Sequence, residues 1–289
     1  MTAKANNEIL KRLEEEGGKG GLPPRLLEFY QRLWQIQSGA EQRIGTVRTG
    51  LKQEAINERL ERGRPLISFD KLALDRSLLK DIFTEVTATF ADYPDLFGEL
   101  PQSLRKPKAR PSLSKKVAKA WFQGARLPAT IAVDDASEYL LLEAIIHATI
   151  RPFLVSYAKT LINSVDQERW RREYCPICGG KPDFAFLDKE RGARWLLCSR
   201  CDSEWLFQRL QCPYCGTQNQ NVLAYFTDDK GLYRLYVCEQ CHKYIKAIDL
   251  RHTELEVQLP LERVLTLDMD RQAQEKGYQP DHSEALSST

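Results

Sequence analysis

The sequence predicts an α+β protein, with an N-terminal all-α helical domain followed by tandem small β modules and a closing helix. Apolar residues follow helical spacing through much of the first 170 residues, and short β-type stretches begin at Tyr174. All eight cysteines lie between residues 175 and 241. A chain of 289 residues is long enough for two domains with separate cores.

We expect residues 1–22 to form a flexible N-terminus and residues 23–170 to form the helical domain. The stretches "PPRLLEFYQRLWQI" and "SLLKDIFTEVTATFADYPDLF" each carry an apolar helical stripe, and the first has proline at its start. A third helix begins in "DDASEYLLLEAIIHATI", where Asp135 precedes Glu138 by three residues and predicts an N-terminal cap. Its apolar residues lie nearly all round the helix, which indicates a central buried position. Pro152 is expected to kink or split this helix.

The sequence has no segment typical of secretion or membrane insertion. The N-terminal stretch "MTAKANNEILKRLEEEGG" lacks an apolar core, and the longest apolar run is interrupted by Glu143, His147 and Arg151. We therefore expect a cytoplasmic protein whose thiols stay in a reducing compartment. His147 is expected to be a hydrogen-bonded core residue and not a metal ligand.

Residues 171–258 are expected to hold two tandem metal ribbons, at 175–201 and 212–241. Short β-type stretches, "DFAFL", "ARWLL", "VLAYF" and "LYRLYV", alternate there with turn residues and cysteine pairs. The stretch "PLERVLTLDMDRQAQEKGY" predicts a closing helix over 259–278, with proline at its start and glycine at its end. A disordered polar tail is expected over 279–289.

Every cysteine belongs to a Cys-x-x-Cys pair, which favours metal binding. The predicted ligands are Cys175, Cys178, Cys198, Cys201, Cys212, Cys215, Cys238 and Cys241. A reducing compartment disfavours permanent disulfides, and a dithiol oxidoreductase normally carries one such pair, not four in a cluster. Redox dithiols and structural disulfides are the alternatives to metal binding.

Two stretches of the cysteine region are alike, and they indicate how the ligands are shared. "CPICGG" is followed by "RWLLCSRC", and "CPYCGT" is followed by "LYVCEQC". The repeat favours sequential pairing, with the first four cysteines on one ion and the last four on a second. A cross-braced arrangement, which pairs the first knuckle with the third and the second with the fourth, also satisfies tetrahedral geometry. In either case, the glycine after "CPIC" and "CPYC" allows the positive φ that such a knuckle needs.

Four thiolates per site suit one Fe or Zn ion, and ligand type does not separate the two metals. Rubredoxin-like iron centres and zinc ribbons use the same Cys-Pro-x-Cys-Gly knuckle. A four-sulfur site is closed to substrate, so we expect the two ions to stabilise the fold, by roughly 10 kcal/mol or more, and not to catalyse. The sequence contains no phosphate-binding glycine loop, nucleophile elbow or zinc-protease motif. It therefore predicts no catalytic residue, no residue that binds an organic cofactor and no enzyme.

The stretch "YCPICG … WLLCSRCDSEWLFQRLQCPYCG … CEQCHKYIK", with "LDMDRQAQEKGY" behind it, resembles the formate dehydrogenase accessory protein family FdhE over roughly residues 170–278. The resemblance implies a cytoplasmic, non-catalytic maturation factor, or chaperone, needed for the activity of respiratory formate dehydrogenase. Its partner would be the catalytic subunit, which carries a molybdenum or tungsten bis-pterin cofactor and an iron-sulfur cluster, before export. Members of this family carry paired rubredoxin-like metal ribbons that are associated with iron. The resemblance therefore implies that the metal ligands are the same eight cysteines.

Two other functions fit the cysteine pattern: a zinc-ribbon nucleic-acid-binding protein and a rubredoxin-like redox protein. Eight thiolates and two dications change the formal charge of +2 to about −2, which argues against nucleic acid. The acidic stretches "CDSEW" and "FTDDKG" lie among the aromatic residues of the same region. We therefore expect a protein partner and no nucleic acid; the oligomeric state stays open.

Overall fold

The computed structural model describes residues 9, 11–13, 22–105, 113–128 and 135–281. It divides into two compact units: the first comprises residues 1–47 and 68–156, and the second comprises residues 48–67 and 157–289, both without the undescribed residues. The predicted flexible N-terminus and disordered tail lie largely outside the described residues, and the predicted domain boundaries stay predictions. Residues 48–67 and 157–170, which were expected in the helical domain, belong to the second unit.

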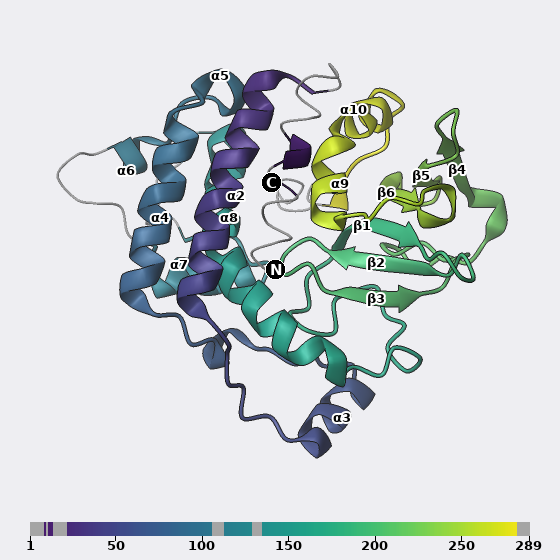
Figure 1. Ribbon diagram of the computed structural model, residues 1–289, viewed down its shortest axis with the longest axis horizontal. Helices are drawn as coiled ribbons and strands as arrows, with labels where there is room; N and C mark the ends of the chain where they lie inside the picture. The colour runs from purple at the N-terminus through teal and green to yellow at the C-terminus, as the bar shows by residue number, and fades with distance from the viewer. Residues whose placement is uncertain (1–8, 10, 14–21, 106–112, 129–134, 282–289) are drawn as a thin grey trace. The chain divides into compact units, whose positions relative to one another are not determined.

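The described part of the first unit is helical. Helices α2 and α4 lie side by side (Figure 1). The elements are α2 (Pro24–Ile44), η1 (Phe69–Lys71), α4 (Arg76–Ala91), α5 (Pro94–Phe97), α6 (Gln102–Arg105), α7 (Lys115–Phe122) and most of α8 (Ala136–Leu161). Helix α4 starts at a side-chain cap, where the Leu78 N–H donates to Asp75 Oδ1 over 2.7 Å. Its apolar stripe is buried as expected: Leu79, Ile82, Phe83, Val86 and Phe90.

Helix α8 continues through Pro152, so the proline does not split it. Proline has no N–H to donate to the carbonyl four residues earlier, which belongs to Ala148. The side chain of Gln37 takes over this role, because its Nε2 donates to Ala148 O over 3.0 Å. Its Oε1 accepts from Arg151 Nη1, also at 3.0 Å. The predicted cap at Asp135 is confirmed, since Oδ1 of Asp135 accepts from the Glu138 N–H at 2.9 Å.

By length and composition, one helix in the described part of the chain, residues 136–164, could cross a membrane. Within the structure, 72% of its most apolar window is buried, as in the core helix of a globular protein. His147 on this helix stacks on Trp121, with ring centroids 5.7 Å apart.

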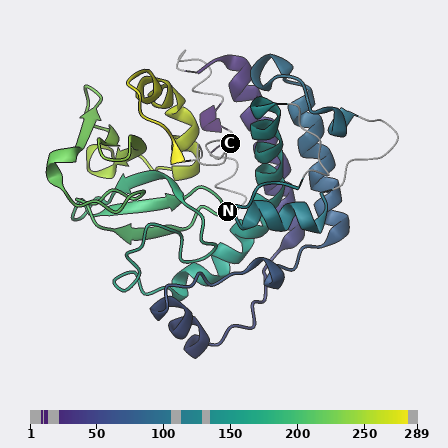
Figure 2. The same ribbon diagram turned by 180° about the vertical axis from the view of Figure 1, so that it is seen from behind.

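The second unit is built on one six-stranded sheet, seen from opposite sides in Figures 1 and 2. The strands are β1 (Pro182–Leu187), β2 (Arg194–Cys198), β3 (Glu204–Phe207), β4 (Leu223–Thr227), β5 (Tyr233–Cys238) and β6 (Lys243–Asp249), in the order β3-β2-β1-β6-β5-β4. Strands β1 to β3 form one antiparallel ribbon and β4 to β6 form the other. The two ribbons join through the parallel pairing of β1 with β6. The predicted α+β class, with four-cysteine β modules, is confirmed.

The β-type stretches of the sequence predicted β1, β2, β4 and β5, but not β3 or β6. Strand β6 is buried at six of its seven positions, yet it carries charged residues that obscure its apolar pattern. Lys246 is 3% exposed and its Nζ lies 2.5 Å from Asp270 Oδ2. Asp249 is 0% exposed and accepts from Arg234 Nη2 over 2.6 Å. Partners distant in the sequence therefore make these charges compatible with burial.

Helices and short turns complete the second unit. They are α3 (Gln53–Glu61), η2 (Ile162–Ser164), η3 (Gln220–Val222), η4 (Leu250–His252), α9 (Leu259–Leu265) and α10 (Leu267–Glu275). The predicted closing helix is present as the consecutive helices α9 and α10. The break lies at Thr266, whose hydroxyl donates to Glu262 O over 2.7 Å. Ala273 of α10 packs with Tyr244 of β6 and Val237 of β5, so this helical segment covers part of the sheet.

Candidate metal centres

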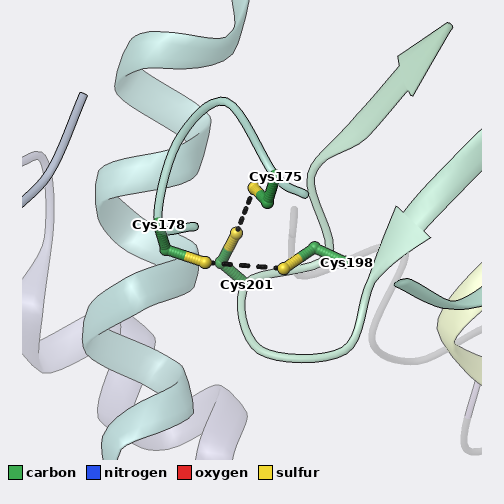
Figure 3. A group of neighbouring side chains, drawn as sticks. All are labelled: Cys175, Cys178, Cys198 and Cys201. Atoms are coloured by element: carbon green, nitrogen blue, oxygen red, sulfur yellow. Dashed lines mark hydrogen bonds between the residues drawn. The ribbon is translucent and has the colours of Figure 1, made fainter. Parts of the chain in front are cut away.

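The first cysteine site consists of Cys175, Cys178, Cys198 and Cys201, whose sulfurs all lie within 4.8 Å of one another. Figure 3 shows the two knuckle loops presenting these sulfurs toward a common centre. Sulfur–sulfur distances are 3.6 Å for Cys175–Cys201 and 3.5 Å for Cys178–Cys198. A tetrahedron with metal–sulfur bonds of about 2.3 Å has edges of about 3.8 Å, whereas a disulfide needs about 2.05 Å. The spacing therefore fits four ligands of one ion and not two disulfides.

The second cysteine site consists of Cys212, Cys215, Cys238 and Cys241, again with all sulfurs within 4.8 Å. The distances Cys212–Cys241 and Cys215–Cys238 are both 3.7 Å. The eight thiols are thus grouped sequentially, as the internal repeat predicted, and not cross-braced. Each group could hold a metal ion; that these cysteines are metal ligands in the cell stays a prediction.

All four knuckles share one backbone feature: the residue after the second cysteine has a left-handed conformation. These residues are Gly179 (φ 74°), Asp202 (φ 53°), Gly216 (φ 73°) and His242 (φ 53°). Glycine adopts this conformation readily, and Asp and His are among the side chains that tolerate it best. The sequence indicated the two glycine knuckles but gave no such signal for Asp202 or His242.

This turn directs backbone amides at the sulfurs. In the first site the Ile177 N–H donates to Cys175 Sγ at 3.3 Å and the Gly180 N–H donates to Cys178 Sγ at 3.4 Å. Such donors favour the thiolate form, which is the form that binds a metal. These hydrogen bonds join residues two positions apart in the sequence, so they do not depend on distant parts of the chain.

Burial opposes ionisation of several of these thiols. It raises the pKa of Cys175 and of Cys201 well above the usual value, and it raises the pKa of Cys212 to about 11. Hydrogen bonds from Cys175 and the other two thiols lower the pKa of Cys178. Four adjacent thiolates in a buried pocket need a compensating cation, so this donor set fits a dication such as Zn²⁺ or Fe²⁺.

The first site is covered by a segment that lies more than 100 residues earlier in the chain. The Leu66 N–H donates to Pro176 O and the Ile67 N–H donates to Ile177 O, both over 2.8 Å. At the second knuckle, Arg263 of α9 donates from Nη2 to Cys198 O over 3.0 Å. As a result, all four cysteines of this site are buried.

The second site is more open. Cys215 is exposed and Cys241 is half-buried, whereas Cys212 and Cys238 are buried. The C-terminal segment supports its last knuckle, because the Gln279 N–H donates to His242 O over 2.8 Å. Part of this site therefore faces solvent.

Within the described residues, these two sites are the groups of neighbouring His, Cys, Asp or Glu side chains that could hold a metal ion. Each offers four sulfurs, which complete a tetrahedron and leave no position for water or substrate. An ion held there would connect the two ends of a β ribbon. Closed four-sulfur sites of this kind are typical of structural metal ions.

The part of the chain that holds the first site matches a known family model. Residues 174–209 match the model described as "FdhE, central domain". The chain is 28% identical to the "Protein FdhE homolog" of Aquifex aeolicus over 258 residues, which cover 88% of this chain and 85% of that protein. It is 33% identical over 125 residues to the "Protein FdhE homolog" of a Shewanella species, over 42% of this chain and 41% of that protein.

The fold is also similar to a solved structure, the crystal structure of the FdhE protein from Pseudomonas aeruginosa. The TM-score is 0.60 at 21% identity, and the alignment covers 97% of this chain and 94% of that chain. This likeness shows a shared fold. Together, the central-domain match, the relative aligned over most of both chains and the shared fold support the assignment of this chain to the FdhE family.

Proposed function

We propose that this chain is a cytoplasmic accessory protein that binds the catalytic subunit of respiratory formate dehydrogenase and is needed for its activity. The observation that carries the proposal is the pair of four-cysteine sites on one sheet, in a chain that is similar to an FdhE homologue over most of its length. In this proposal the sites shape a binding surface, and the protein is not an enzyme.

The geometry of the cysteine sites supports a structural role for the metal. Four sulfurs at tetrahedral spacing complete the coordination, so neither water nor substrate would have a position on the ion. The ion would supply a cross-link between ribbon ends. The chain's own residues favour metal binding at the first site, since two knuckle amides donate to its sulfurs and burial excludes water from it.

Capture of the catalytic subunit by this protein tests the proposal. Wild type is expected to retain the subunit from an anaerobic lysate, whereas Cys175→Ala and Cys212→Ala should lose metal and most of the capture. Lys189→Glu, a change at an exposed residue in an ion pair of 3.7 Å, serves as the folded control. Equal capture by wild type and by metal-free cysteine variants would contradict the proposed role of the sites.

We further propose that each site holds one ion of Fe or Zn, with the eight cysteines as ligands. Metal analysis and absorption spectra of protein prepared without oxygen distinguish the metals. A colourless protein with two zinc ions supports purely structural sites. An iron–thiolate spectrum that bleaches reversibly on reduction would instead favour a redox function.

A further inference from the structure

The second unit has a pocket beside the second cysteine site. Its walls are largely apolar and include Leu210, Tyr214, Leu223, Tyr225 and Tyr236. The water-accessible volume is about 70 Å³, which suits the end of one side chain and is too small for an organic cofactor. Cys212 and Cys238 also line the pocket, so an occupant would lie next to the candidate metal.

Apart from the cysteines of the candidate metal site, the charged residues of this pocket all have the same sign. Arg194, Arg209 and Lys243 line it, and its lining includes no Asp or Glu. Lys243 already has a partner, since its Nζ lies 2.5 Å from Asp281 Oδ1. The two arginines have no carboxylate among the residues that line the pocket, so it is complementary to an acidic group.

The side chain of Arg194 indicates independently that the pocket lacks a hydrogen-bond acceptor. It is 3% exposed, and its Nη2 donates to the carbonyl oxygens of Gln208 and Gln211. Its Nε has no hydrogen-bond partner among the described residues. Buried donors are normally paired, and an unpaired donor on a buried cation costs free energy. A carboxylate brought by a partner would compensate this charge.

The pocket opens beside an unpaired strand edge. Strand β4 lies at the edge of the sheet. At the two ends of its pairing with β5, the Glu239 N–H donates to Val222 O over 2.9 Å and the Asp228 N–H donates to Tyr233 O over 3.2 Å. Hydrogen-bonded and non-hydrogen-bonded pairs alternate in an antiparallel ladder. The N–H and C=O groups of Tyr225 therefore point away from β5, as do those of Leu223 and Thr227.

Several exposed side chains on or beside this edge are large and apolar. Tyr225 is 53% exposed, Phe226 is 44% exposed and Leu210, on the loop beside the pocket, is 56% exposed. Open strand edges are usually blocked by charges, proline or a covering element, because they pair readily with another chain. An edge that combines free backbone groups, aromatic side chains and a side-chain pocket is typical of sites that accept an added strand.

We propose that β4 and its pocket bind an extended segment of the partner protein, which pairs with β4 as an added strand. The segment places an apolar side chain in the pocket and an acidic side chain near Arg194 and Arg209. The inference rests on the proposed function for the partner's identity, the formate dehydrogenase catalytic subunit. The open backbone of β4 favours a polypeptide over nucleic acid, because only a polypeptide can continue the ladder.

Photo-cross-linking tests where the partner binds. Tyr225→p-benzoylphenylalanine places the probe at the pocket, and Leu255→p-benzoylphenylalanine places it at a residue that is 70% exposed and does not line the pocket. With purified catalytic subunit, we expect at least about tenfold more cross-linked product from position 225. Peptide mapping should identify one segment that contains both apolar and acidic residues.

Affinity measurements with matched variants test the chemistry. Arg209→Glu and Tyr225→Ser should each weaken binding at least about tenfold. Lys189→Glu, a charge reversal outside the pocket, and Leu255→Ser, at an exposed residue that does not line the pocket, should change it less than about twofold. Binding of wild type should also weaken as salt increases, because exposed charges are screened. All these positions are exposed, so metal content and folding should not change.

The outcomes separate the two proposals. If wild type does not bind the catalytic subunit, the proposed function is wrong and so is the partner named here. If wild type binds it but position 225 does not cross-link to it, or all variants bind equally, the proposed function stands and the β4 site is wrong. Cross-linking of position 225 to a second copy of this chain or to nucleic acid, in place of the catalytic subunit, would also overturn the β4 proposal.

Discussion

The two cysteine sites arise from one repeated sequence pattern, yet their surroundings differ. Both bring four sulfurs within 4.8 Å, and both begin with a Cys-Pro-x-Cys-Gly knuckle. All four cysteines of the first site are buried, whereas Cys215 of the second is exposed and Cys241 is half-buried. The repeat therefore determines the donor set, and the burial of each site depends on residues outside the repeat.

The cover of the first site shows how this difference arises. Leu66 and Ile67 donate backbone hydrogen bonds to its first knuckle, and Arg263 donates to Cys198 O at its second. The second site shares a wall with the pocket beside β4, and its last knuckle contacts the segment at Gln279. We infer that the first site mainly stabilises the fold and that the second lies where a partner can approach.

The largest expected effect comes from removing one ligand in each site. Cys178→Ala should lower the free energy of unfolding by several kcal/mol, because structural sites supply roughly 10 kcal/mol or more and the closed first site has no room for a replacement ligand. Cys215→Ala should cost clearly less, because water can reach the vacated position at this exposed residue. Urea unfolding followed by circular dichroism, with metal content measured in parallel, checks both values. Equal losses would show that burial does not distinguish the sites.

A matched pair of glycine substitutions sharpens the comparison with a smaller effect. Gly179→Ala and Gly216→Ala each place a side chain at a left-handed position, with φ of 74° and 73°, which costs about 1–2 kcal/mol. At Gly179 the added Cβ would also lie 3.0 Å from Cγ of Pro65, in the segment that covers the first site. At Gly216 it would meet the flexible ends of Glu173, at 3.3 Å, and of Gln211, at 3.8 Å. Thermal unfolding should therefore show a larger loss for Gly179→Ala; the reverse order would contradict the role of the cover.

The smallest expected effect concerns the rate of metal release. With zinc in both sites the ligands are chemically identical, so the sites differ only in how easily solvent and a chelator reach the ion. A competing chelator should remove one ion at least about tenfold faster than the other, which corresponds to about 1.4 kcal/mol in the barrier. Cys215→Ser should make the fast phase faster still and leave the slow phase unchanged. A single release phase in wild type would mean that the sites are equally protected.

Sequence reasoning predicted the candidate sites better than the sheet. The grouping of eight cysteines follows from two copies of a local pattern, and the structure places the sulfurs accordingly. Strand β6 was missed because Lys246 and Asp249 hide its apolar pattern, and their partners Asp270 and Arg234 lie 24 and 15 residues away in the chain. The short strand β3 was missed as well, and the parallel β1–β6 pairing that joins the ribbons has no local signal.

Helix α8 gives the same lesson in the first unit. The sequence correctly indicated its cap at Asp135, which depends on a residue three positions from its partner. It also indicated that Pro152 would disturb the helix, yet the helix is not split. Gln37, on a different helix, donates to the carbonyl that the proline leaves without its usual donor. No local pattern identifies such a partner.

The sequence by itself determined the fold class, the helical and β-rich regions, the four Cys-x-x-Cys pairs and the family resemblance, because each depends on residues close together in the chain. The tertiary structure alone decided that both ribbons share one sheet, that Pro65–Ile67 covers the first site, and that β4 is an open edge beside an arginine-lined pocket. The physical reason is that knuckles and caps form from local hydrogen bonds, whereas burial and strand order depend on contacts between distant segments.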